Sequence, residues 1–334
     1  MATAPLDAAI QTTALARLAQ FPVAPLGHYP TPIDSMDRLR RATGLTQRIL
    51  VKRDDAIPFG FGGNKVRKLR FVIPAVLADG ADTIVTCGGP QSNHARATAA
   101  AATFSGLACH IVVNGTEPNP PSANALLNRH LGATFEYVSS RPERRPAMDR
   151  AAARLRAAGR HPVIVPLGAS TPHGALGYLD GVGEMLAQGV RPDVIVHACS
   201  SGGTSAGILA GCALSGLTTR VIGISADDPP VAVETEVRGI ITGLELLLSI
   251  PEGTLNRAIQ LEIDDRFVGT GYGEPTDGSV TAQRLVATAE AIFLDHTYTA
   301  KAFAGLLAKC RDGSIPRDAT VLFWHTGGQV ALFA

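Results

Sequence analysis

The sequence predicts an α/β protein built on mostly parallel sheets that helices cover on both faces. Short strand-like runs alternate with longer helical segments, most of these runs are apolar almost throughout, and Gly-rich segments follow several of them. Strands buried on both faces read as continuous apolar runs, and their alternation with helices is typical of parallel sheets. A chain of 334 residues is long enough for about two domains.

The first half of the chain supplies one series of elements. Residues 1–30 are rich in Ala and Pro and are expected to wrap the surface, and Thr31–Gly44 reads as a loop and a short helix ending at glycine. We then expect strands at Arg48–Asp55, Ala81–Gly88, Ala108–Asn114, Ala133–Val138 and His161–Gly168, and helices at His94–Gly106, Ala123–Gly132, Met148–Gly159 and Gly174–Gly189.

The second half repeats the same alternation. The predicted elements are strands at Pro192–Ser200, Thr219–Ala226 and Ala319–Gly328, and helices at Gly203–Gly216 and near Ala300–Lys309. Helix and loop signals mix in Asp227–Asp265, so no element is assigned there. No internal repeat or low-complexity linker interrupts the chain.

Composition excludes several classes of protein. Apolar residues make up 46% and charged residues 18% of the chain, which excludes a disordered protein. A net charge of +1 and an aromatic content of 5% argue against nucleic-acid binding. The apolar stretch Ala97–Val113 is interrupted by polar residues and the N-terminus lacks the pattern of a signal peptide, so no membrane association is expected.

The five cysteines are widely spaced, odd in number and without a CxxC pair. This pattern favours reduced, buried thiols in a cytoplasmic protein, and it offers no zinc site. We therefore expect no disulfide framework and no metal.

Four Gly-rich segments stand at or just beyond predicted strand ends: GGNK (62–65), CGGPQSNH (87–94), SSGGTSAG (200–207) and HTGG (325–328). Ligands of parallel sheets bind outside the carboxyl ends of the strands. The arrangement predicts one ligand that backbone groups hold from several directions.

SSGGTSAG follows a strand and opens a helix, so the backbone N–H groups of Ser201, Gly202, Gly203 and Thr204 are suited to a phosphate. The alternative is a turn made only for tight packing. The segment is not GxGxxG and lacks the lysine of a P-loop, which disfavours dinucleotides and nucleoside triphosphates.

Lys65 stands at the start of a predicted helix, where the partial positive charge of the helix end disfavours a cation. Such a lysine is either exposed to solvent or used in chemistry, and a Schiff base with a carbonyl cofactor removes its charge. Lys68 lies one turn further on, within reach of the same phosphate. The alternative is a pair of surface lysines.

Two further segments combine short polar residues with helix starts or turns. Ser92 and Asn93 suit a carboxylate or a phenolic oxygen, or they simply cap a helix. Tyr272 and Tyr298 lie in polar, turn-rich contexts that suit acid–base catalysis, although packing is the alternative for each.

Together, KRDD, GGNKxRKL, QSNHxR, SSGGTxAG, GYGxP, YTxKAxAGL and HTGG occur in an order that resembles the D-cysteine desulfhydrase / ACC deaminase family. These are pyridoxal-phosphate (PLP) enzymes of the tryptophan-synthase-β fold, fold type II, and the resemblance runs from about Pro30 to the C-terminus. It implies two α/β domains with the cofactor in the cleft between them. Residues 1–65 and 177–334 would form the large domain, and 66–176 a small, mobile one.

The resemblance also implies the residues that hold the cofactor. Lys65 matches the lysine that forms a Schiff base with PLP, while Lys68 and residues 201–204 match the phosphate contacts. Asn93 matches the residue that bonds the phenolic oxygen. Thr326 matches the residue that faces the pyridine nitrogen, and a neutral hydroxyl there makes PLP a weaker electron sink, which suits β-elimination.

Other matching residues are implied to act on the substrate. Ser92, with Asn93 and His94, matches the cradle of the substrate carboxylate, and Tyr272 and Tyr298 match two active-site tyrosines. We rank Lys65 first as the base that removes the α-proton, because it sits at the reacting carbon, and burial makes it less basic than in water. Tyr298 protonates the leaving group or shares the base role.

The lead reading is the elimination of D-cysteine to pyruvate, sulfide and ammonia. His94, Thr299 and Thr326 stand as in D-cysteine desulfhydrases, whereas ACC deaminases typically carry Glu and Leu at the last two positions. ACC deaminase, L-cysteate sulfo-lyase and a racemase or dehydratase of the same fold are the alternatives, and a phosphate-ligand binding protein without catalysis is the reading from another class. Relatives are usually dimers, so a homodimer acting on a small amino acid is expected.

Three segments depart from the family pattern: the Phe-Gly pair in FGFGGNK, Pro90 beside Cys87, and the short, Pro-rich loop Asn114–Ser122. Relatives carry a longer loop at the last position, near the substrate entrance. These departures bear on the choice of substrate rather than on the cofactor.

Overall fold

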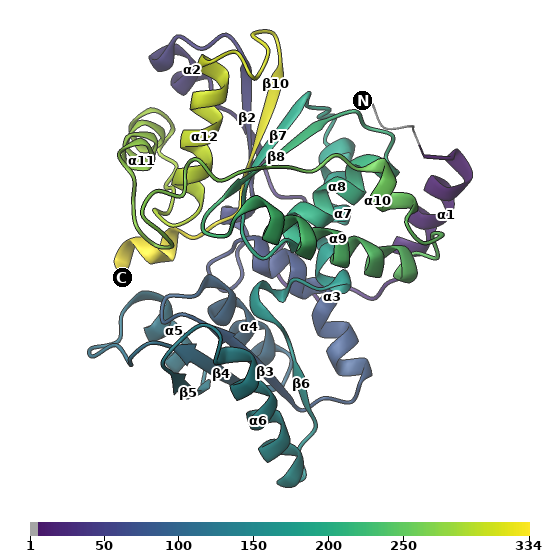
Figure 1. Ribbon diagram of the computed structural model, residues 1–334, viewed down its shortest axis with the longest axis vertical. Coiled ribbons are helices and arrows are strands. Elements are labelled where there is room, and N and C mark those ends of the chain that lie inside the picture. Colours follow the sequence, from purple (N-terminus) through teal and green to yellow (C-terminus); the bar gives the residue numbers. More distant parts are fainter. Residues whose placement is uncertain (1–5) are drawn as a thin grey trace.

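The computed structural model describes residues 6–334 and arranges their strands in two sheets (Figure 1). The larger sheet has the strand order β1-β2-β10-β7-β8-β9 and the smaller one β5-β4-β3-β6, and all paired neighbours are parallel except β1 and β2. The strands are β1 Ile33–Ser35, β2 Arg48–Arg53, β3 Thr83–Gly88, β4 Ala108–Asn114, β5 Thr134–Val138, β6 Pro162–Ile164, β7 Val194–Cys199, β8 Arg220–Ser225, β9 Glu262–Asp264 and β10 Thr320–His325.

Helices connect these strands and cover both sheets (Figure 1). The α-helices are α1 Ala8–Leu18, α2 Asp37–Thr43, α3 Asn64–Ala78, α4 Asn93–Phe104, α5 Ala123–His130, α6 Arg144–Ala157, α7 Pro172–Ala187, α8 Gly203–Leu214, α9 Pro230–Leu247, α10 Thr254–Ala258, α11 Asp277–Glu290 and α12 Thr299–Arg311. Short 3-10 helices occupy Asp54–Ala56, Leu167–Ala169 and Gln329–Phe333. Within residues 6–334, no helix has the length and apolar character that crossing a membrane requires.

Each sheet has a core on both of its faces, as the continuous apolar strands predict. Ile195 of β7 packs in one core with α7, α8 and α9, whereas its neighbours Val194 and Val196 pack on the other face with α2, α11 and α12. Successive side chains of a strand point to opposite faces, so both sets must be apolar when both faces are covered. The predicted fold class is confirmed.

Some boundaries and elements differ from the expectation. The predicted strand His161–Gly168 is limited to β6, because Pro166 cannot donate to a sheet and Gly168 adopts a left-handed backbone with φ 73°. The unassigned stretch Asp227–Asp265 contains the long helix α9, and α11 was not anticipated. Of the segment 1–30, residues 1–5 lie outside the described residues, and the remainder includes the short helix α1, which packs beside α8.

All five cysteines are buried and free, in agreement with the prediction of reduced thiols. The strands of the smaller sheet all lie between residues 83 and 164, inside the predicted segment 66–176. The boundaries at 66 and 177 remain a prediction.

Helices α3, α7 and α8 approach one another closely through glycines. A Cβ atom at Gly177 of α7 would lie 2.3 Å from the carbonyl oxygen of Arg67 on α3, and one at Gly207 of α8 would lie 2.4 Å from Cβ of Tyr178 on α7. The small residues of these helices therefore set the distances between them. As a result, α3 is held firmly where its first turn meets the carboxyl ends of the larger sheet.

Candidate active site

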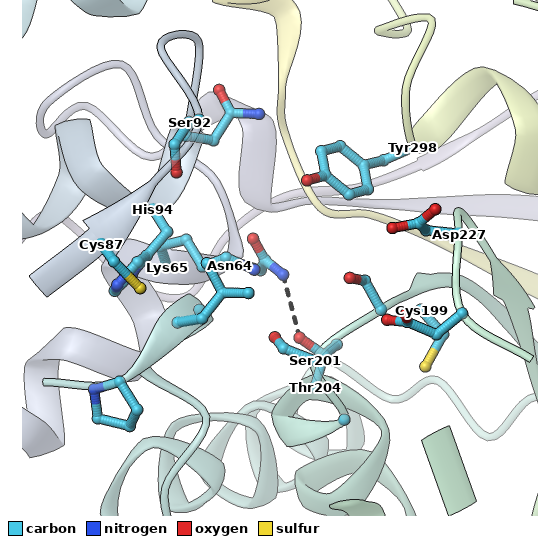
Figure 2. A pocket seen from close by; sticks show the side chains of 18 of the residues that line it. Asn64, Lys65, Cys87, Ser92, His94, Cys199, Ser201, Thr204, Asp227 and Tyr298 are labelled. Carbon is cyan, nitrogen blue, oxygen red and sulfur yellow. Dashed lines mark hydrogen bonds between the residues drawn. The ribbon is translucent and has the colours of Figure 1, made fainter. Parts of the chain in front are cut away.

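A cavity of about 500 Å³ lies where the Gly-rich segments of both sheets converge. Loops that follow β3, β7 and β10 supply its lining, together with the first turns of α3, α4 and α8. Figure 2 shows side chains from these segments around one space. The predicted residues that line it are Lys65, Lys68, Ser92, Asn93, His94, Ser201, Gly202, Thr204, Tyr272, Tyr298 and Thr326; Gly203 lies in the loop directly beside it.

Lys65 is the second residue of α3, as its Gly-rich approach predicts. Gly63 precedes the helix with φ 99°, and the N–H of Asn64 donates to the carbonyl oxygen of Thr326 at 2.9 Å. Loss of solvent around the Lys65 amine lowers its pKa to about 8, against an opposing effect from Cys199. A substantial fraction of the amine is thus neutral near physiological pH, as a nucleophile or base requires.

This pKa predicts how the chain would take up pyridoxal phosphate, the cofactor that the resemblance implies. Only the neutral Lys65 amine attacks an aldehyde, so the second-order rate of covalent attachment should rise with pH and level off above about 8. Stopped-flow absorbance between about pH 6.5 and 9.5, a range that brackets this value, measures the rate. A profile that keeps rising toward the ordinary lysine pKa of 10.5 would contradict the shift.

A pocket of donors beside Lys65 fits a phosphate group. The amine of Lys68 is buried, and it contacts only neutral acceptors, the carbonyl oxygen of Gly168 at 3.2 Å and Oγ of Ser170 at 3.1 Å. Burial and the nearby Lys65 charge hold the pKa of Lys68 well below its ordinary value. Among residues 6–334 no carboxylate pairs with this amine, and an anion would supply the missing charge.

The loop before α8 completes this cradle. Oγ of Ser170 lies 2.8 Å from Oγ of Ser201, and a Cβ at Gly203 would come within 2.8 Å of Ser170 Oγ and 2.9 Å of Lys68 Nζ. The structure records no partner in the described chain for the N–H groups of Ser201 and Thr204. Free N–H groups at a helix start bind phosphate, so these residues fit the phosphate of the cofactor that the resemblance implies.

Asn93 and Thr326 offer the other contacts that such a cofactor needs. Oδ1 of Asn93 accepts a hydrogen bond from Nδ2 of Asn124 at 3.0 Å, so the amide nitrogen of Asn93 is the group left to donate, as a phenolic oxygen requires. Thr326 uses its carbonyl group to hold Asn64. Its hydroxyl has no recorded partner within residues 6–334 and remains available for the ring.

The start of α4 offers N–H groups to an anion. Ser92 caps this helix by accepting from the N–H of Ala95 at 3.2 Å, while the N–H groups of Asn93 and His94 have no recorded partner in the described chain. The imidazole of His94 contacts Thr86 Oγ1 at 2.7 Å and Thr98 Oγ1 at 3.2 Å. Burial lowers its pKa well below the ordinary value, so the ring is neutral and His94 offers its backbone N–H to a ligand.

Tyr272 and Tyr298 form a pair on the opposite side of the cavity. Their hydroxyl groups are hydrogen-bonded to each other, and their rings meet edge to face with centroids 5.7 Å apart. Asp295 fixes Tyr298 by accepting from its N–H at 2.9 Å. Burial raises the pKa of both phenols, for Tyr298 well above the ordinary value, so both are protonated at neutral pH. The pair can therefore donate a proton.

Several residues of the site were not predicted. Ser170 lies two residues beyond the predicted strand His161–Gly168. The rule that ligands bind at the carboxyl ends of strands, which located the other segments, could have identified it. Asn64, whose Nδ2 donates to Thr204 Oγ1 at 3.0 Å (Figure 2), stands inside the GGNK motif. Arg141 and Arg144 also line the cavity, but their surroundings in the sequence resemble an ordinary charged helix start.

Arg96 of α4 connects the two sides of the site. Its guanidinium donates to the carbonyl oxygens of Gly60 at 2.5 Å and Gly62 at 3.2 Å, in the loop that leads to Lys65. Burial lowers the pKa of Arg96 to about 10, which leaves it charged at neutral pH. The helix that offers N–H groups to an anion is thus tied to the lysine loop.

Comparison with known proteins agrees with the family resemblance found in the sequence. Residues 24–327 match the family model described as "Pyridoxal-phosphate dependent enzyme". The chain is 36% identical over 330 residues to a 1-aminocyclopropane-1-carboxylate deaminase of Burkholderia cenocepacia, covering 95% of this chain and 97% of the relative. It is 34% identical over 333 residues to a D-cysteine desulfhydrase of Klebsiella pneumoniae, covering 96% and 98%.

Solved structures agree in fold. An ACC deaminase homologue superposes with a TM-score of 0.87 at 33% identity, covering 96% of each chain. A threonine deaminase from Solanum lycopersicum superposes with a TM-score of 0.71 at 17% identity, covering 98% of this chain and 87% of that one. The second match shows a shared fold alone.

Proposed function

The chain belongs to the pyridoxal-phosphate-dependent enzymes, in the family of ACC deaminases and D-cysteine desulfhydrases, and from this membership we propose that it eliminates the β-substituent of a small amino acid. The lead substrate is D-cysteine, which with one water gives pyruvate, hydrogen sulfide and ammonia. The Cα–H and Cβ–S bonds break, and water later replaces the amino group. Pyridoxal phosphate is the cofactor. We assign its binding to the residues that fit it, namely Lys65, Lys68, Asn93, residues 201–204 and Thr326.

The observation that carries the choice of substrate concerns Thr299. Its hydroxyl donates to Oδ1 of Asp295 at 2.6 Å and accepts from the N–H of Asp295 at 2.8 Å, so it is used inside the protein and brings no acid to the cavity. The resemblance implies Glu at this position in ACC deaminases. A site without that acid favours loss of a thiolate over ring opening.

Each group in the site has a separate role in the proposed elimination. Bound pyridoxal phosphate supplies an electron sink for the negative charge that develops at Cα. We assign the substrate carboxylate to the free N–H groups at the start of α4 and the hydroxyl of Ser92. Lys65, whose pKa is lowered to about 8, takes the α-proton. Tyr298, protonated and paired with Tyr272, donates a proton to the departing sulfur.

Replacement of Tyr298 tests this assignment. Tyr298→Phe keeps the ring that packs against Tyr272 but removes the proton donor, and kcat for D-cysteine should fall about 10²- to 10³-fold, within the range for a general acid. Elimination from β-chloro-D-alanine should change less than threefold, since chloride leaves without a proton. Equal losses on both substrates would show that Tyr298 acts in positioning instead.

The test of the function itself is product formation by the purified holoenzyme. Pyruvate and sulfide are measured with D-cysteine and with L-cysteine, and 2-oxobutanoate is measured with ACC. Pyruvate from the D-enantiomer alone is the expected result. Release of 2-oxobutanoate at a comparable rate would replace the proposal with ACC deamination, the name that the relative from Burkholderia cenocepacia carries.

The proposal also covers the cellular compartment, the domain closure and the oligomeric state of the enzyme. Five buried, free cysteines favour a reducing compartment such as the cytoplasm. We also propose that residues 66–176 close over the bound substrate and that two chains form a homodimer. Gel filtration with light scattering checks the second point, and a monomer at micromolar concentration would refute it.

A further inference from the structure

Three arginines near the start of α6 line the cavity, and they differ in their partners. Arg141 pairs with Asp227 and lies over the ring of Tyr272, 4.6 Å from its centroid. Arg145 pairs with Asp149 at 3.1 Å. Arg144 is half-buried, and no carboxylate within residues 6–334 forms an ion pair with it.

Asn114, the last residue of β4, orients this unpaired guanidinium. Nε of Arg144 donates to Oδ1 of Asn114 at 2.8 Å, and Nη2 donates to the same oxygen. Guanidinium carries five N–H donors, so both hydrogens of Nη1 and one of Nη2 remain without a recorded partner in the described chain. Asn114 also begins the short loop Asn114–Ser122, which departs from the pattern of the family that the sequence resembles.

Arg144 is close enough to several groups of the site to interact with them electrostatically. Burial lowers the pKa of Arg144, and the groups that act on it are the Cys87 thiol, Arg141 and the phenols of Tyr272 and Tyr298, the pair assigned above to the leaving group. The anionic groups of cofactor and α-amino acid already have their places: the phosphate beside Lys68 and the α-carboxylate at the start of α4. Arg144 is therefore free for a third anionic group, one on the substrate side chain.

We propose that Arg144 is a specificity residue that binds an oxyanion on the β-carbon of the substrate, with a sulfonate as the test case. This inference rests on the proposed elimination, keeps D-cysteine as its lead substrate, and adds a second substrate class, amino acids with an oxyanion on the β-carbon. For cysteate, the Cα–H and Cβ–S bonds break and sulfite leaves with the bonding electron pair. One water is consumed, and the products are pyruvate, sulfite and ammonia.

A sulfonate fits the free edge of Arg144 better than a thiol does. Its oxygens accept the parallel N–H bonds that the Nη1–Nη2 edge offers, and such charge-assisted, bidentate bonds are the strong ones. A hydrogen bond to a charged group contributes about 1.5–3 kcal/mol, which corresponds to roughly 10- to 100-fold in affinity. Arg144 would also stabilise the charge that the departing group gains.

Binding without turnover tests Arg144 first. 3-Sulfopropanoate carries both anionic groups but no amine, so it cannot react, and calorimetry on the holoenzyme gives its Kd. Arg144→Gln should weaken binding about 10- to 100-fold and leave the Kd of propanoate unchanged. Arg150→Gln is the matched control, because it removes the same charge from an exposed position of α6 away from the cavity. Equal affinities of wild type and Arg144→Gln would overturn the proposal.

Turnover then separates this inference from the proposed function. Both enantiomers of cysteate and of β-chloroalanine are compared, and Arg144→Gln should lower kcat/KM for cysteate alone, with Arg144→Lys between the two. If β-chloroalanine is consumed while cysteate neither reacts nor competes, the role of Arg144 is wrong and the elimination stands. If no amino acid is consumed while binding of 3-sulfopropanoate still depends on Arg144, the elimination is wrong and the anion site stands.

Discussion

Lys65→Ala should abolish covalent attachment of pyridoxal phosphate and lower kcat/KM by at least about 10⁴-fold, the upper end of what one positioned acid–base group contributes. Lys65 is the lysine at the first turn of α3 whose desolvated amine has a pKa of about 8. In the proposed function, both the bond to the cofactor and removal of the α-proton depend on this amine. Borohydride reduction followed by mass spectrometry of peptides locates the attached cofactor.

Lys68→Ala is the contrasting variant. We propose that its amine holds the phosphate of the cofactor, so we expect weaker cofactor binding with the covalent bond retained. A Lys65→Ala protein that still fixes pyridoxal phosphate after borohydride treatment would refute the assignment. Partial recovery of elimination by added methylamine, without recovery of the bond to the protein, would support Lys65 as base.

The second large effect is expected on stability, at Asp54. This fully buried carboxylate accepts two hydrogen bonds from Arg67, at 2.6 and 2.9 Å, and one each from Tyr178 and Trp324, both at 2.8 Å. Asp54→Asn removes the charge and places an amide among donors. We expect a loss of about 3–5 kcal/mol in unfolding free energy, since breaking a buried ion pair is strongly destabilising even though Arg67 keeps Glu184 as a carboxylate partner at 2.9 Å.

The pH dependence of this loss has a definite sign. Burial alone would raise the pKa of Asp54, but the charge and hydrogen bonds of Arg67 outweigh it and hold the pKa below the ordinary 3.8. A depressed pKa in the folded state adds stability at neutral pH that is lost as the pH falls through the folded value. The difference between wild type and Asp54→Asn should thus be constant from about pH 6 to 8 and shrink below about pH 4.

Urea denaturation at these pH values measures the difference, and Asp180→Asn provides the control. Asp180 pairs with Arg70 at 3.4 Å, and 40% of its side chain is exposed. Such a pair contributes about 0–1 kcal/mol. A cost at Asp54 no larger than that at Asp180 would mean that the buried network is dispensable for stability.

The sequence predicts the fold well where one physical cause dominates. Continuous apolar strands such as Val194–Cys199 report burial on both faces, and glycines at strand ends report the ligand-binding edge. Helix α9 escaped prediction because its apolar positions are interrupted by Gly239 and Gly243, and Gly243 serves a close contact with Pro172 that only the folded chain shows.

The residues of the candidate site also fall into those that the sequence predicts and those that it does not. Lys65 and the loop before α8 stand in local patterns whose chemistry is readable, and the resemblance adds their roles. Arg144 and Ser170 have no such pattern, because what distinguishes them is the partner that each has or lacks in space. An arginine without an acid becomes recognisable only when Asn114, thirty positions away in sequence, is seen to hold it.

Arg96 has a consequence for how the enzyme moves. Because α4 holds the carbonyls of Gly60 and Gly62 through this one buried side chain, the helix and the lysine loop form a single mechanical unit. A rotation of α4 toward a bound carboxylate would be transmitted to the first turn of α3. Capture of the substrate and final alignment of the Lys65 amine would then be one movement, and the loop at residues 60–65 would follow the proposed closure of residues 66–176.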